Sequence, residues 1–136
     1  GQSTYTVCLE RTYHHLDVHF TFDQRKYDES EITPELIRET RQICEEKYGL
    51  RGSDDEIRRA ILNDMKTEIH TLAELNGHFL GCVHKQLLDR HMVWDGENAS
   101  EGCVPQPAID GVLKVTVLVF NVLKDHTHYT LAVYAE

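Results

Sequence analysis

The chain has 136 residues, of which 40% are hydrophobic and 27% are charged, and its formal net charge at pH 7 is −9. These values are typical of a folded protein, exclude disorder and collagen-like repeats, and predict one domain over residues 1–136. The Lys and Arg residues are scattered and no apolar run approaches the ~20 residues of a membrane helix. We therefore expect neither a nucleic-acid nor a membrane partner.

The first predicted elements are two β-strands. Apolar residues alternate with polar ones over residues 4–9 and again over residues 15–22, but in opposite phases. One strand cannot hold both sets on one face, because side chains alternate with a period of two. We therefore expect a turn near residues 11–14 and two antiparallel strands.

Two helices follow in the prediction. Thr33-Pro34 suits the start of a helix, and Gly49 suits its end. Ser53 begins a second helix with acidic residues in its first turn. Because helical apolar spacing continues as far as residue 88, this helix is expected to cover residues 54–90, with a break at Asn76-Gly77.

A long loop over residues 92–110 and two more strands, 112–123 and 128–135, complete the chain. The order β-β-α-α-β-β predicts an α+β fold with a four-stranded antiparallel sheet and helices on one face. Strand 112–123 is apolar on both faces, so we expect a homo-oligomer in which another subunit covers the outer face. This order resembles the tunnelling fold of pterin and purine enzymes, whose subunits associate into barrels.

Nine histidines are many for a chain of this length. The first candidate site consists of four residues from two predicted strands. His15, Asp17 and His19 share one strand face, and His128 lies on the last strand. Imidazole binds zinc, copper, iron or nickel, and an Asp beside His also suits proton transfer. We expect His15 or His19 to be a base or metal ligand, Asp17 to orient it and His128 to face it. The alternative is a solvated strand face.

A second candidate site follows a four-residue spacing. His70, Glu74, His78 and Cys82 would stack on one side of a helix, where His78 and Cys82 could hold a metal. The alternative is a plain polar stripe. Pairing of Cys82 with a strand His, as in papain-like hydrolases, is a further hypothesis that no local signature around Cys82 supports.

Motifs that are absent from the sequence disfavour several classes of function. No CxxC occurs, which excludes a zinc ribbon or a thioredoxin-type motif. Four cysteines could form disulfides in an exported protein, but we expect reduced thiols and a cytoplasmic location. The absence of GxGxxG, Walker, HExxH and GxSxG motifs disfavours dinucleotide binding, nucleotide hydrolysis, zincin proteolysis and serine hydrolysis.

Two hypotheses for function remain. In the first, an oligomeric protein with a His-rich site binds or acts on a small polar molecule by lyase, isomerase or hydrolase chemistry, assisted by a metal such as zinc if one is bound. In the second, a non-catalytic regulatory or interaction protein assembles under the control of His protonation.

Overall fold

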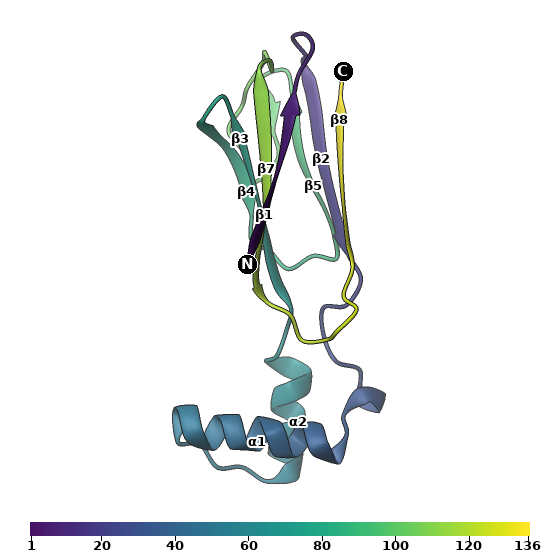
Figure 1. Ribbon diagram of the computed structural model, residues 1–136, viewed down its shortest axis with the longest axis vertical. Helices are drawn as coiled ribbons and strands as arrows, with labels where there is room; N and C mark the ends of the chain where they lie inside the picture. Colours follow the sequence, from purple (N-terminus) through teal and green to yellow (C-terminus); the bar gives the residue numbers. More distant parts are fainter.

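Two antiparallel four-stranded sheets pack against each other, with two helices at one end (Figure 1). The computed structural model describes residues 1–136. The β1 sheet contains, in spatial order, β1 (Gln2–Cys8), β7 (Val112–Asn121), β3 (Glu68–Leu75) and β4 (His78–Val83). The β2 sheet contains β6 (Asn98–Ala99), β5 (Asp89–Asp95), β2 (His15–Phe22) and β8 (Tyr129–Ala135).

The main core lies between the sheets and follows from side-chain alternation. In β2, the buried residues Leu16, Val18, Phe20 and Phe22 alternate with half-buried polar residues. Leu16 and Val18 join one hydrophobic cluster with residues of β7 and β5, among them the sole tryptophan, Trp94. Each sheet therefore has one face in the core and one outer face.

The helices lie between β2 and β3 in the chain. A short 3-10 turn (Glu29–Glu31) precedes α1 (Pro34–Tyr48) and α2 (Asp54–Asn63). The predicted caps are confirmed: Thr33 accepts a hydrogen bond from the Leu36 N–H, and Gly49 ends α1 at φ 63°. Four isoleucines form a separate small core at this end, namely Ile32, Ile37, Ile57 and Ile61. No helix is long and apolar enough to cross a membrane.

The predicted second helix over 54–90 is wrong beyond Asn63. Residues 68–75 form β3, in which Ile69, Thr71, Ala73 and Leu75 are buried at every second position. Ile69, Leu72 and Leu75 also fit helical spacing, which is why the pattern was ambiguous. Asn76-Gly77 is the turn of a β-hairpin, with φ values of 52° and 81°, rather than a break within a helix.

The predicted single sheet with helices on one face is also wrong. β1 and β2 do not pair with each other, because they belong to different sheets, and the same holds for β7 and β8. The face of β7 that carries Leu113, Val115 and Val117 packs against the β2 sheet of the same chain, whereas Phe120 on the outer face of β7 is 61% exposed, so the expected cover by a second subunit stays a prediction. The tunnelling-fold resemblance depended on the expected order and is not confirmed. The coarser prediction of a mixed α+β fold is confirmed.

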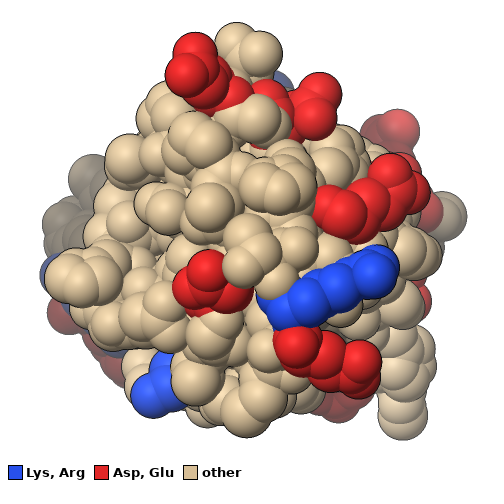
Figure 2. All heavy atoms as spheres, turned by 90° about the horizontal axis from the view of Figure 1, so that it is seen from above, with Lys and Arg blue, Asp and Glu red and all other residues tan.

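Charged side chains are spread over the end of the sandwich that lies opposite the helices. In the view of Figure 2, acidic side chains predominate and basic ones do not gather into a patch. This distribution agrees with the formal net charge of −9.

Candidate functional site

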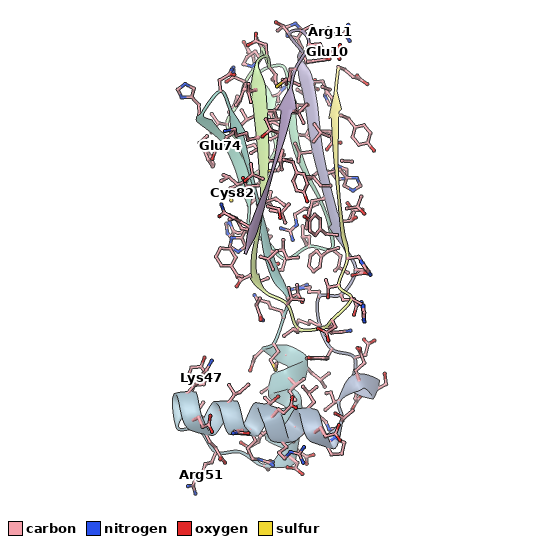
Figure 3. All side chains as sticks on the ribbon, in the orientation of Figure 1. Glu10, Arg11, Lys47, Arg51, Glu74 and Cys82 are labelled. Atoms are coloured by element: carbon pink, nitrogen blue, oxygen red, sulfur yellow. The ribbon has the colours of Figure 1, made fainter.

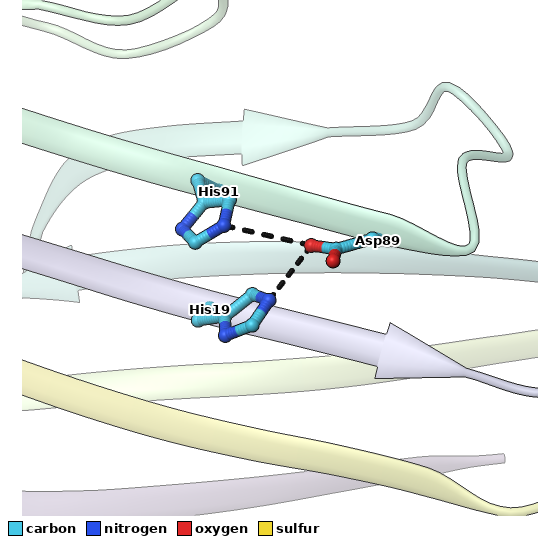
Figure 4. A group of neighbouring side chains, drawn as sticks. All are labelled: His19, Asp89 and His91. Atoms are coloured by element: carbon cyan, nitrogen blue, oxygen red, sulfur yellow. Dashed lines mark hydrogen bonds and ion pairs between the residues drawn. The ribbon is translucent and has the colours of Figure 1, made fainter.

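Three side chains that bind metals in other proteins meet on the outer face of the β2 sheet (Figure 4). His19 belongs to β2, and Asp89 and His91 belong to β5. The antiparallel register places His19 directly opposite His91, and it places Asp89 opposite Thr21, one step along the same face. Because neighbours on the two strands point into the core, these three side chains point outward.

The ligand atoms of these residues converge. His19 Nε2 lies 2.7 Å from Asp89 Oδ1, and His91 Nε2 lies 3.5 Å from the same oxygen. The two imidazole rings stack with their centroids 3.9 Å apart and an angle of 6° between their planes. One ligand atom from each residue lies within 4.8 Å of the other two. Because a metal lies near the plane of each imidazole that binds it, the two stacked rings would have to turn toward each other and the Asp89 side chain would have to shift for the three residues to hold one cation.

Asp17 orients His91 from the other side of its ring. The two Asp17 carboxylate oxygens lie 2.9 and 3.1 Å from His91 Nδ1. Since a carboxylate accepts, Nδ1 donates in this contact, which leaves the lone pair of a neutral His91 ring on Nε2. By the same rule His19 donates from Nε2 to Asp89, and a metal would have to replace that proton. A carboxylate behind a histidine in this way is the usual outer partner of a metal-binding imidazole.

The cluster is open to solvent on one side. The side chains of Asp89 and His91 are 66% and 46% exposed, whereas those of His19 and Asp17 are 28% and 24% exposed. Two His and one carboxylate occupy three positions around a metal and leave others for water or a ligand. This open form is typical of catalytic rather than structural metal sites.

A pocket of about 270 Å³ adjoins the cluster, with Asp89 and His91 in its lining. Its other walls come from the end of β4, the loop between β4 and β5, and residues 100–102. Lys85 and Glu101 form an ion pair at 3.0 Å in this lining. The pocket gives a small molecule a place beside the open side of the cluster.

The first predicted site is brought together only in part. Asp17 and His19 belong to the cluster or contact it directly. His15 shares their face but pairs with Asp95 at 3.4 Å, outside the converging group. His128 lies just before β8, is exposed, and its backbone N–H donates to Asp23. It therefore does not face His15 or His19 as expected.

The second predicted site is not a helical stack, because its residues lie on two strands. His70 and Glu74 belong to β3, and His78 and Cys82 belong to β4. Figure 3 labels Glu74 and Cys82, which lie on these two neighbouring strands. His78 is exposed beside the hairpin turn, and Cys82 pairs with Leu72. The four-residue spacing therefore no longer brings His78 and Cys82 to one point.

The thiols are free, and two of them are disfavoured as nucleophiles. No disulfide joins Cys8, Cys44, Cys82 or Cys103. Burial raises the pKa of the Cys82 thiol, with Arg90 opposing the rise, and burial also raises the pKa of Cys103. Because the thiolate is the reactive form, neither thiol is activated at neutral pH.

The sequence-based search missed Asp89 and His91. Both lay where the prediction placed the end of a helix and the start of a loop. The sequence contained one indication of a strand here, because Arg90, Met92 and Trp94 lie at every second position. In the structure all three residues are buried. Period-two alternation over 89–95 would have predicted a strand with His91 on its polar face.

Comparisons with known proteins show which family the chain belongs to and show no function. Searches of curated proteins and of solved structures give no match to this chain. The family model described as "Family of unknown function (DUF6669)" matches residues 1–136, and the chain therefore belongs to that family.

Proposed function

We propose that this protein binds a divalent transition metal such as zinc through His19, Asp89 and His91, and that it binds or acts on a small polar molecule in the adjoining pocket. The observation that carries the proposal is the orientation of His91. Asp17 holds its Nδ1 proton, so its Nε2 is directed with His19 Nε2 toward the same Asp89 oxygen. A bound metal would supply a Lewis acid and an activated water at the mouth of the pocket, which suits hydrolase, lyase or isomerase chemistry.

The proposal is tested by zinc titration of the purified chain. We expect about one zinc per chain, as in sites with three protein ligands, and a loss of this binding in His19→Ala and His91→Ala. His78→Ala is the matched control, because His78 is an exposed strand histidine that belonged to the other predicted site. Equal weakening in His78→Ala, or no stoichiometric zinc binding, would contradict the proposal. The regulatory hypothesis would then be favoured if assembly changed with pH.

We also propose self-association, on a ground different from the one the sequence suggested. β1 and β8 are the open edges of the two sheets, and their sequences, QSTYTVC and YTLAVYA, contain no charged residue and no proline. The edge of β4 is covered instead, since the Cys82 N–H donates to the Gly102 carbonyl at 3.0 Å. Open, uncharged edges pair readily with another strand.

Light scattering during size-exclusion chromatography tests this second proposal. The expected result is a dimer that Thr130→Lys, a charge on the outer face of β8, converts to a monomer. A native chain that remains monomeric at the concentrations of the zinc titration would refute it.

A further inference from the structure

Arg90 is a buried cation with no carboxylate partner. Its side chain points inward from β5 and the residue is 3% exposed. Its guanidinium donates only to backbone carbonyls: Ile69 at 2.7 Å, Leu87 at 3.2 Å and Val83 at 3.4 Å. Its Nη2 makes no hydrogen bond.

The surroundings of Arg90 offset only part of the cost of burying a charge. The guanidinium lies 4.9 Å from the ring centroid of Phe20 and 5.6 Å from that of Phe22, within reach of cation–π attraction. Burial lowers the pKa of Arg90 to about 10, so the side chain remains charged at neutral pH. A buried charge is stable when a counter-charge accompanies it, and an unused guanidinium nitrogen calls for an acceptor.

Arg90 is among the residues that line the pocket beside the metal site, although its Nη2 has no solvent-exposed surface. Val83 and Leu87, whose carbonyls accept hydrogen bonds from the guanidinium, also line the pocket. The other charged residues of the lining already have partners, since Lys85 pairs with Glu101 and Asp89 pairs with His19. Arg90 is therefore the one Lys, Arg, Asp or Glu of the lining that lacks an ion pair.

The size of the pocket limits the ligand. Its volume of about 270 Å³ lies just below the range of about 300–1,000 Å³ that is usual for ligand pockets, so the ligand must be a small molecule. Val83, Leu87 and Cys82 give the lining an apolar part. A compact anion with an apolar body fits both features.

We propose that the pocket binds a small organic carboxylate, with its charged group directed to Arg90 and its apolar body against Val83 and Leu87. This inference rests on the proposed function, because the pocket shares Asp89 and His91 with the metal site, and it names the ligand class of that site. A carboxylate is the natural counter-ion of a guanidinium. Binding itself needs no metal.

The test compares benzoate with its neutral isostere benzamide on chelator-treated, metal-free protein, followed by amide NMR shifts. Benzoate is expected to shift the signals of residues 83–91 with saturation and to bind about tenfold tighter than benzamide. Equal binding of the two probes, or no saturation by benzoate, would overturn the proposal.

Two matched variants extend the test without removing Arg90 from the core. Leu87→Glu puts a negative charge in the lining at a residue that is 51% exposed, and Leu88→Glu puts the same charge at a neighbour that is 45% exposed and lies outside the lining. Benzoate binding should weaken about tenfold in Leu87→Glu and stay unchanged in Leu88→Glu. Equal weakening in both variants would refute a specific site.

The two proposals can fail separately. If zinc binds at the His cluster but metal-free protein does not prefer benzoate, the carboxylate inference is wrong and the metal site stands. If benzoate binds through the pocket but zinc does not bind, the metal site is wrong.

Discussion

Asp17 provides the sharpest test of the metal site, because it touches His91 and none of the other ligands. Its carboxylate accepts from His91 Nδ1 at 2.9 and 3.1 Å, and its side chain is 24% exposed. Asp17→Asn keeps an acceptor for the Nδ1 proton but removes the charge, whereas Asp17→Ala removes both. Loss of such an outer partner weakens metal binding about 10–100-fold, or about 1.4–2.7 kcal/mol. We expect Asp17→Asn near the lower end of this range and Asp17→Ala near the upper end.

The assay is a competitive zinc titration against a chromophoric chelator. Asp95→Asn is the control, because Asp95 pairs with His15 on the same outer face, at 3.4 Å, but outside the converging group. Its zinc affinity should equal that of the native chain. The reasoning is refuted if Asp95→Asn weakens zinc binding as much as Asp17→Asn, or if neither Asp17 variant changes the affinity.

Three further predictions concern stability, each followed by urea unfolding with the buried Trp94 as the fluorescence probe. Leu16→Ala, at a fully buried position, should lower the free energy of unfolding by about 2–5 kcal/mol through lost packing, and a loss under 1 kcal/mol would contradict the assigned core. Asn76→Ala removes side-chain hydrogen bonds to Val112 and Asp110 at 2.8 and 2.9 Å and puts alanine at φ 52°, so it should cost about 3 kcal/mol; no loss would refute that role. A hydrogen bond from Lys124 lowers the pKa of Glu31, so the stability linked to ionised Glu31 is present above its ordinary value of 4.5 and is lost as the pH falls through the lowered pKa. Glu31→Gln should therefore be less stable than the native chain at neutral pH but equal at acid pH, and a constant difference would count against the pair.

The candidate site was only partly predictable from the sequence. Alternation over residues 15–22 correctly placed Asp17 and His19 on one polar strand face, opposite Leu16 and Val18. The partner strand could not be found the same way, because pairing of β2 with β5 joins residues some 70 positions apart, such as Asp17 and His91. Such long-range pairing depends on which strands share a sheet, and local patterns do not specify that.

Local signals determined the elements wherever they were unambiguous. The caps at Thr33 and Ser53, the glycine end of α1, and the strands β1, β2, β7 and β8 all follow from residue type and period. Between the predicted start of the second helix and residue 88 the apolar residues fit a helical period, so Asn76-Gly77 was interpreted as a break instead of a hairpin turn. That interpretation concealed β3 and β4, and the predicted loop over residues 92–110 concealed part of β5.

The sequence by itself thus determined the mixed α+β character, the first helix and the start of the second, the alternating faces of β2 and the acidic charge of this protein. The tertiary structure alone decided that the strands form two sheets, that the second sheet covers the apolar face of β7, and that His91 rather than His15 or His128 stands beside His19. The physical reason is that hydrogen bonding along a strand is satisfied equally well by many neighbours. The choice among them is made by the burial of one apolar face of each sheet against the other sheet, which is a property of the whole chain.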